Sequence, residues 1–345
     1  MKFVLSPEQL DVAAVAAKVL SERLPMPRVR ELAESAESGA LALAVDDETW
    51  DRCAELGWFG LGVPDALGGV GCGPIEEIML FTELGRHLAP GPFASTVIAG
   101  WVAAASGDDA LATSVFEGRR RAGLEVGGFV LDAEPGGLVV RFEGMACELV
   151  SIDGVDQVPS VDPSVRLSRR GTAATVARLE DPLVEARAQL LISSMELGIA
   201  QAVLEMSVEY AKFRHQFGKP IGTFQAVKHR CSDMAMRVHA ARAQILFAGY
   251  HVESRTDDAA FQAAAAKTMA TKAAKLNTAD NVQNHGAIGF TVEHDAGLFA
   301  RRAHMLEYAL GGDLGAAPRL LEVDRHRFET LPPAVDQWFS PTFDA

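Results

Sequence analysis

The chain has 345 residues, and 48% of them are hydrophobic, which is enough for two or three modest domains around a sizeable packed core. Wholesale disorder is therefore excluded. The formal net charge of −14 argues against a general nucleic-acid surface or an anionic-membrane surface, because both need a basic face. Any anionic ligand must bind at a local basic patch.

The cysteines and the termini place further limits on the class of protein. The four cysteines lie far apart without a CxxC pair, so neither a disulfide framework nor a metal site is expected. We interpret them as small core residues in a reducing cytoplasm. The N-terminus lacks the residue order of a secretion signal. The longest apolar run, Phe93 to Ala105, falls short of the ~20 residues that span a bilayer. We expect a cytoplasmic protein without a membrane segment.

The N-terminal part is predicted to be helical. Ser6, Pro7 and Gln9 combine an N-cap serine, a proline at the first helical position and a capping-box glutamine. Further helical patterns follow between loops rich in proline and glycine. They cover Asp47 to Leu56, Ile75 to Leu88, Phe93 to Ala105 and Asp109 to Phe116.

From Gly123 to Asp181 the pattern changes to short valine- and leucine-bearing runs interrupted by Gly, Pro and Asp, which predicts a small β module. The helical period then returns in Leu183 to Phe213, Phe224 to Glu253 and Ala259 to Val282, with shorter pieces to about Arg327. In the second of these segments apolar residues recur at steps of four and three, which predicts the seam of a four-helix bundle. The seam residues are Val227, Cys231, Met234, Val238, Ala241 and Ile245.

We therefore predict a mainly α fold with a small β module. The expected domains are an N-terminal helical domain at residues 1–122, a short middle β domain at 123–182 and a C-terminal four-helix bundle at 183–345.

The most specific segment is Arg214-His215-Gln216-Phe217-Gly218-Lys219-Pro220-Ile221-Gly222, followed by Phe224-Gln225-Ala226-Val227-Lys228-His229. It joins two predicted bundle helices through a turn rich in glycine and proline. An arginine at such a corner offers a planar fork of donors that suits phosphate. From the residues alone, phosphate binding and a plain helix connection both remain open.

This segment resembles the signature Arg-x-Gln-Phe-Gly-x-Pro-Ile-x-x-Phe-Gln-x-Val-x-His of the flavin-dependent acyl-CoA dehydrogenase family. In that family it lies against the FAD of a neighbouring subunit, with the arginine near the pyrophosphate and the phenylalanine near the adenosine half. The resemblance implies that five residues contact FAD bound to a partner. These residues are Arg214, Gln216, Phe217, Gly218 and Gln225.

A second segment, Gln283-Asn284-His285-Gly286-Ala287-Ile288-Gly289-Phe290-Thr291, interrupts a helix with small residues that let backbone amides approach a ligand. On its own it is more typical of a helix-terminating turn. It also resembles the family's Gln-x-x-Gly-Gly-x-Gly loop, which binds the same pyrophosphate, with alanine in place of the second glycine. The resemblance implies contacts from Gln283, Gly286, Ala287 and Gly289. His285 and His294 have no second ligand at metal-like spacing and are interpreted as hydrogen-bonded structural residues.

The early loop Leu56-Gly57-Trp58-Phe59-Gly60-Leu61-Gly62-Val63-Pro64 also resembles the family, so the resemblance covers roughly three quarters of the chain. It implies an acyl-CoA dehydrogenase fold.

The resemblance is incomplete where the family removes a proton from its substrate. A working member has a glutamate that takes the α-proton of the acyl thioester while a hydride passes to the flavin. One family placement is a Tyr-Glu-Gly-Thr sequence, where this chain has Tyr308-Ala309-Leu310-Gly311-Gly312. The other placement falls near Ala188, and the nearest carboxylate, Glu185, is almost one helical turn away. The catalytic residue is therefore unknown.

The residues that hold the flavin ring in the family are missing as well. The family places a Trp-x-Thr/Ser motif in its β domain, but here Trp50, Trp58, Trp101 and Trp338 all lie outside the β module. No stretch resembles the Glu-Pro-x-Ala-Gly-Ser loop of the family. The half of the site that a subunit lends to its neighbour is retained, and the half that it keeps is lost.

The resemblance thus implies one subunit of a heterotetrameric acyl-CoA dehydrogenase of the steroid-degrading type. A second acyl-CoA dehydrogenase-like subunit would supply the base and the ring pocket, the substrate would be an acyl-CoA, and an electron-transfer acceptor would reoxidise FAD. One alternative is a homo-oligomeric dehydrogenase with an unorthodox base such as Glu185. Another is a structural partner that holds no flavin.

Overall fold

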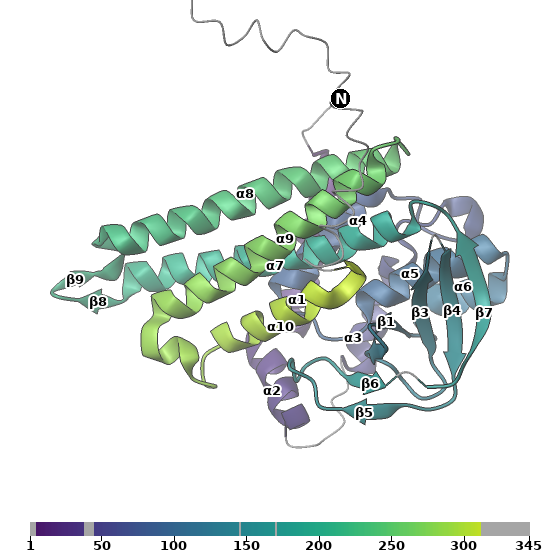
Figure 1. Ribbon diagram of the computed structural model, residues 1–345, viewed down its shortest axis with the longest axis horizontal. Helices are drawn as coiled ribbons and strands as arrows, with labels where there is room; N and C mark the ends of the chain where they lie inside the picture. Colours follow the sequence, from purple (N-terminus) through teal and green to yellow (C-terminus); the bar gives the residue numbers. More distant parts are fainter. Residues whose placement is uncertain (1–4, 38–44, 145, 170, 312–345) are drawn as a thin grey trace, which may run out of the picture.

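The computed structural model of the chain describes residues 5–37, 45–144, 146–169 and 171–311 (Figure 1). A helical part, a β module and a helical bundle follow one another along the sequence, which confirms the predicted mainly helical fold with a small sheet. The helical pieces predicted beyond residue 311 lie outside the described residues, and the domain boundaries stay a prediction.

The N-terminal part begins with the predicted capping box. The Ser6 hydroxyl accepts from the Gln9 backbone N–H at 3.3 Å, and the Gln9 side chain accepts from the Ser6 N–H at 3.0 Å. The next helix, Met26–Glu37, was not predicted because charged residues interrupt its short apolar stripe. The elements are α1 (Pro7–Arg23), α2 (Met26–Glu37), α3 (Asp47–Glu55), η1 (Trp58–Gly60), η2 (Asp65–Leu67), α4 (Pro74–Arg86), α5 (Phe93–Ser106) and α6 (Asp109–Phe116).

The β module is one seven-stranded sheet with the strand order β5-β6-β2-β1-β3-β4-β7. Its strands are β1 (Ala122–Val126), β2 (Phe129–Leu131), β3 (Leu138–Glu143), β4 (Ala146–Ile152), β5 (Asp156–Val158), β6 (Leu167–Arg169) and β7 (Ala173–Glu180). Pairing is antiparallel except between β1 and β3. Alternate residues of β3 face opposite sides: Leu138 and Val140 join the main core, and Val139 joins a small core of the module.

The bundle is built on α7 (Val184–Phe213), which packs against α4, α8 (Gln225–Glu253) and α9 (Ala259–His285). Helix α4 crosses α7 at a point where a glycine of each helix lies against the backbone of the other helix. A Cβ on Gly198 would lie 2.0 Å from the Thr82 carbonyl oxygen. Helix α10 (Ala296–Tyr308) and η5 (Ala309–Gly311) cover the side of the bundle next to the sheet (Figure 1). A hairpin of β8 (His215–Gln216) and β9 (Lys219–Pro220), with η3 (Ile221–Thr223), joins α7 to α8.

The predicted seam of α8 is buried from Met234 to Ile245, whereas Val227 and Cys231 near the hairpin are only half-buried. The bundle therefore narrows toward the end that carries the hairpin. Helix α7 is long and apolar enough to cross a membrane, but 72% of its most apolar window is buried inside the protein. It is the central core helix of the bundle.

Candidate functional site

The arginine corner, residues 214–225, begins where α7 ends. The Arg214 N–H donates to the Tyr210 carbonyl at 2.8 Å, and the Arg214 carbonyl accepts from the Ile221 N–H at 2.8 Å. Phe217 and Gly218 form the tip of the hairpin with φ angles of 54° and 77°. Positive φ at both central residues is the requirement of a tight two-residue hairpin turn, which favours glycine at the second position. The corner is thus a rigid turn, as its sequence predicts.

Side chains at the arginine corner point into solvent. Phe217 is 89% exposed and Phe213 is 83% exposed. Gln216 and Gln225 are exposed as well. Within the described ranges, no carboxylate pairs with the Arg214 guanidinium or with the Lys228 ammonium on the first turns of α8. Two unpaired cations beside two exposed aromatic rings form a local basic patch on a chain of net charge −14.

The glycine loop, residues 283–291, begins at the last turn of α9. Gly286 has φ 65° and ψ −140°, and nothing approaches the position of a Cβ there, so its backbone is open to a ligand. The next residues form η4 (Gly286–Phe290). Gly289 is buried, and a Cβ there would lie 2.7 Å from the Val282 carbonyl oxygen. Ala287 and Gln283 are exposed, so alanine in place of the second glycine does not crowd the core.

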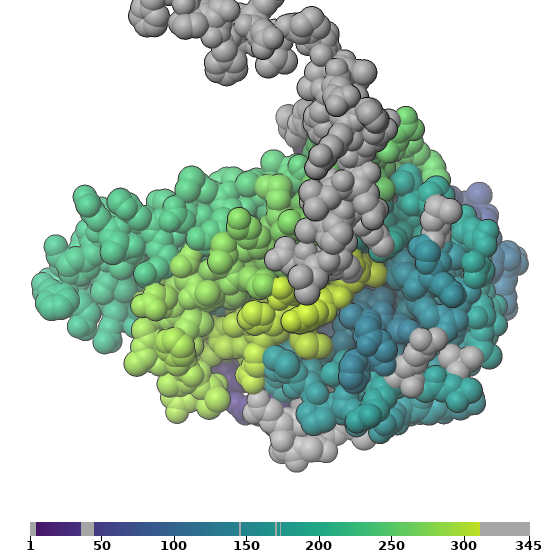
Figure 2. Space-filling view, in the orientation of Figure 1, coloured from purple at the N-terminus to yellow at the C-terminus, as the bar shows by residue number. Residues whose placement is uncertain are grey.

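The fold brings the two segments together at one end of the bundle. The ring of Tyr210, one turn before Arg214, lies 4.2 Å from the ring of His285 at the end of α9. Arg230 of α8 donates to the Asn284 side chain at 2.8 Å. This end projects away from the sheet (Figure 1) and forms the tip of the described chain in Figure 2.

The opposite end of α7 contains a cavity of about 230 Å³, which we call the inner pocket. Leu310, from the turn where the family has one placement of its base, and Glu185, the carboxylate nearest to the other placement at Ala188, line the same space. The other lining residues come from β1, β3 and the end of α10: Glu125, Val126, Gly127, Arg141, Phe142 and Tyr308. Glu185 belongs to the first turn of α7, and Leu310 belongs to η5.

Residues 6–116 match the N-terminal domain of acyl-CoA dehydrogenases, and residues 182–313 match their C-terminal domain. The chain is 33% identical over 300 residues to the acyl-CoA dehydrogenase IpdE2 of Mycobacterium tuberculosis, and the match covers 86% of this chain and 88% of IpdE2. The chain belongs to the acyl-CoA dehydrogenase family. It is also 33% identical to FadE34 of the same organism, where the match covers 85% of this chain but 46% of FadE34.

Solved structures of acyl-CoA dehydrogenases share the fold. The ChsE4-ChsE5 complex from Mycobacterium tuberculosis superposes with a TM-score of 0.77 at 22% identity, covering 96% of this chain and 100% of that one. A Tcur3481-Tcur3483 steroid acyl-CoA dehydrogenase variant superposes with a TM-score of 0.75 at 22% identity, covering 91% and 96%. The family uses FAD. The two ends of α7 differ in how well they fit the adenosine-pyrophosphate part and the flavin ring of that cofactor.

The adenosine-pyrophosphate part of FAD fits the projecting end. Arg214 and Lys228, which pair with no carboxylate among the described residues, would supply positive charge for phosphates, the uncrowded Gly286 would let a ligand approach closely, and exposed Phe217 would supply a ring face for a base. The sequence analysis did not include Lys228 among the site residues. A signal was present: no acidic residue stands three or four positions from Lys228 along α8 to pair with it.

The flavin ring does not fit the inner pocket in the same way. No tryptophan lines the pocket or occurs in Tyr308-Ala309-Leu310-Gly311. Two residues of this turn, Ala309 and Leu310, are apolar and buried. Leu310 adopts a left-handed conformation, φ 54° and ψ 47°, and its carbonyl accepts from the Gln189 side chain at 3.1 Å. A second cavity nearby, lined in part by Ile192, Met195 and Met305, measures only about 50 Å³. A larger cavity of about 380 Å³ also borders the first turn of α7, where Leu183, Arg187 and Trp101 are among its lining residues.

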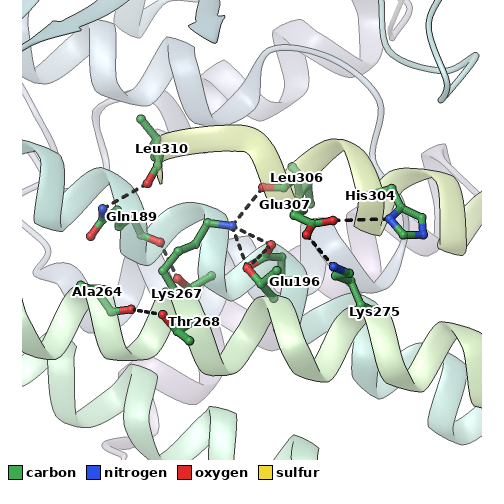
Figure 3. Close-up of polar contacts among 12 residues, drawn as sticks. Gln189, Glu196, Ala264, Lys267, Thr268, Lys275, His304, Leu306, Glu307 and Leu310 are labelled. Carbon is green, nitrogen blue, oxygen red and sulfur yellow. Dashed lines mark hydrogen bonds and ion pairs between the residues drawn. The ribbon is translucent and has the colours of Figure 1, made fainter. Parts of the chain in front are cut away.

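A buried charge network fixes η5 and the end of α10 against α7 (Figure 3). Lys267 and Glu196 are fully buried, with the ammonium 2.7 Å from one carboxylate oxygen. Lys267 also donates to the Thr271 hydroxyl and to the Leu306 carbonyl, each at 3.0 Å. Burial raises the pKa of Glu196 while the charge of Lys267 opposes the shift. Among the described residues the second oxygen of Glu196, Oε2, has no hydrogen-bond partner.

Proposed function

We propose that this chain is one subunit of a heteromeric acyl-CoA dehydrogenase and binds the adenosine-pyrophosphate end of an FAD whose ring lies in a partner subunit. The observation on which this depends is the contrast between the two ends of α7. Arg214 and Lys228 are exposed without a counter-ion at the projecting end, whereas apolar and internally paired residues occupy the other. FAD would supply the oxidising ring, and this chain would supply positive charge and an aromatic face to its nucleotide end.

The same contrast supports a catalytic partner. Removal of the α-proton of an acyl thioester needs a base, and the η5 turn offers Ala309 and Leu310 in that place. The partner would supply the base, the ring pocket and the acyl pocket. The similarity to the ChsE4-ChsE5 complex and to the Tcur3481-Tcur3483 steroid enzyme supports a two-component enzyme and a steroid-type acyl-CoA. We propose a heterotetramer in the cytoplasm that passes electrons to a separate flavoprotein acceptor, the class of protein in one structural neighbour.

The proposal is tested on the complex purified from the native cells through a tag on this chain. The wild-type complex should contain about one FAD per heterodimer, and Arg214→Ala should weaken FAD retention by roughly 10- to 100-fold through loss of a charge-assisted hydrogen bond. Arg52→Ala is the control, because Arg52 is an exposed arginine of α3 paired with Glu55. Retention of FAD by Arg214→Ala at the wild-type level would refute the nucleotide-binding role and favour a flavin-free structural partner.

A homo-oligomeric dehydrogenase is the second candidate, and one observation favours it. Glu185 lines the same cavity as Tyr308 and Leu310, so the chain does place a carboxylate beside the turn where the family has its base. The flavin absorbance of the chain purified alone separates the two functions. A colourless chain is expected from the heteromeric proposal. A yellow chain that oxidises an acyl-CoA would establish the homo-oligomeric enzyme.

A further inference from the structure

Three packed aromatic rings connect the two segments of the proposed nucleotide site. Tyr210 of α7 lies 4.2 Å from His285 of α9, centroid to centroid, and His285 lies 4.3 Å from His294 in the loop before α10. The planes are inclined by 31° and 48°. Such spacings are those of directly packed rings. The sequence analysis interpreted both histidines only as hydrogen-bonded structural residues, and the function proposed above uses none of the three.

Each ring is attached to a different part of the site. The Tyr210 carbonyl accepts from the Arg214 N–H at 2.8 Å, so a displacement of Tyr210 moves the arginine. His285 is the last residue of α9 and directly precedes Gly286, where the glycine loop turns. His294 lies where the loop returns to α10, and its Nδ1 accepts from the Ala296 N–H at 3.1 Å. The three packed rings therefore link the residue that anchors Arg214 to the entrance of the loop and to its exit.

Hydrogen bonds determine which ring nitrogen bears the proton in His285 and in His294. Nδ1 of His285 lies 2.8 Å from the Asn281 carbonyl, which only accepts, so this nitrogen bears the proton. Burial, with His294 as a further cause, lowers the pKa of His285, so its ring is neutral at pH 7. Nδ1 of His294 accepts a backbone hydrogen bond and is unprotonated. A neutral His285 ring does not repel the ring of His294, so the two can pack closely.

Within the described residues, no hydrogen bond joins the arginine corner to the glycine loop directly. The nearest cross-links lie deeper in the bundle, where Ser207 donates to Asn281 at 2.7 Å, or on α8, where Arg230 donates to Asn284. The three rings add a side-chain connection between Tyr210, whose carbonyl accepts from the Arg214 N–H, and the start of the glycine loop.

We infer that Tyr210, His285 and His294 are positioning residues that hold the arginine corner and the glycine loop at the separation required to bind one pyrophosphate. This inference rests on the proposed function, because it concerns the same site. The three rings would not touch the nucleotide. Their effect on binding would pass through Arg214 on one side and Gly286 on the other.

The test measures FAD release from the tagged complex, isolated from native cells, for a set of matched variants. Tyr210→Leu keeps apolar bulk but removes the ring, and FAD should dissociate roughly 2- to 10-fold faster. Tyr210→Phe keeps the ring and should release FAD at the wild-type rate. Phe247→Leu is the control, since Phe247 packs on His251 at 4.4 Å in α8, away from the corner. It should lower thermal stability without faster FAD release.

A double variant separates positioning from general stabilisation. Because Tyr210 would act in part through Arg214, Tyr210→Leu combined with Arg214→Ala should release FAD more slowly than the product of the two single effects predicts. If the two single variants increase the rate of FAD release by factors that multiply fully in the double variant, the inference is contradicted. Equal rates of FAD release from Tyr210→Leu and Phe247→Leu would contradict it as well. If the Tyr210→Leu complex does not assemble, His294→Asn replaces it in the test. This variant removes a ring at the loop exit but keeps an acceptor for the Ala296 N–H, and FAD should again dissociate faster than from the wild type. A normal release rate from Arg214→Ala would instead remove the proposed function itself.

Discussion

Helix α7 begins at the inner pocket and ends at the arginine corner, and charged side chains have opposite environments at its two ends. Near the pocket, Lys267 and Glu196 pair without any exposure to solvent, and Arg302 pairs with buried Asp162. At the corner, Arg214 and Lys228 are exposed without a counter-ion among the described residues. Charges of the first kind pair with one another inside the protein and hold the chain together. Charges of the second kind add little to folding and are available to an anion.

Aromatic and apolar residues follow the same division. Leu310 and Ala309 are buried in the place where the family has its base, whereas Phe213 and Phe217 are almost fully exposed. Large exposed rings beside unpaired cations are typical of a surface that a partner or ligand covers. The contrast supports the proposal that one end of α7 is structural and that the other belongs to a binding site completed by another subunit.

The largest expected effect tests the structural end. Lys267→Met leaves the buried Glu196 carboxylate and the Leu306 carbonyl without their donor, and it should lower the free energy of unfolding by about 3–5 kcal/mol at pH 7. The matched control is Lys212→Met, since Lys212 pairs with Glu209 at the exposed end of α7 and should lose less than about 0.5 kcal/mol. Denaturant unfolding of the isolated chain measures both. Equal losses would break the distinction between the two ends.

The helices and the arginine corner differ in how well the sequence predicts them. The long helices are predicted to within a few residues, because α7, α8 and α9 repeat apolar residues at the helical period over many turns. Helix α2 is missed because only Val29 and Ala33 among its described side chains are buried. The arginine corner is predicted because its turn and its cation are contiguous in the sequence. Its role in binding FAD stays a prediction until the Arg214 variant is measured.

Contacts between distant residues could not be predicted. Lys267 and Glu196 lie 71 positions apart, and neither has a neighbour in sequence that suggests a buried partner. The stack of Tyr210, His285 and His294 likewise joins two helices and a loop. The left-handed conformation of Leu310 depends on packing, since nothing in leucine itself favours a positive φ. Such features arise from the tertiary fold and not from local preference.

A second prediction concerns the pH dependence of the structural end. Asp132, which lies beside the smaller cavity, accepts from the Arg166 N–H at 3.1 Å. Burial raises its pKa to about 6, although Arg166 opposes the shift. The native state therefore binds a proton more tightly than the unfolded chain, so this contribution to stability is greatest below about pH 4 and falls as the pH rises through 6. A shift of this size corresponds to about 3 kcal/mol.

Asp132→Asn isolates this effect because asparagine keeps an acceptor for the Arg166 N–H but does not titrate. The stability of the wild type minus that of Asp132→Asn should fall by about 3 kcal/mol between pH 4 and pH 7 in denaturant unfolding. The same difference for Asp156→Asn, an exposed residue near Arg169, should remain flat. A difference that increases with pH would mean that the arginines determine the titration, and Asp132 would then be an ordinary ion-paired carboxylate.

The smallest expected effect tests the binding end through the tip of its hairpin. Phe217 is 89% exposed, so Phe217→Ala should change the stability of the isolated chain by less than about 0.5 kcal/mol. Phe217→Gly should be more stable than Phe217→Ala by about 1 kcal/mol, because glycine adopts the φ of 54° without strain. Both variants remove the ring, so both should release FAD from the complex faster than the wild type.

The control for this prediction is Val161→Ala, which truncates another exposed apolar side chain, 64% exposed, in the β module and should not alter FAD release. If Phe217→Gly is more stable than Phe217→Ala and yet releases FAD equally fast, then the strained backbone and the exposed ring are retained for binding at the expense of folding. If both variants keep FAD at the wild-type level, the ring serves only the contact between subunits. The nucleotide would then depend on the cations and the glycine loop alone.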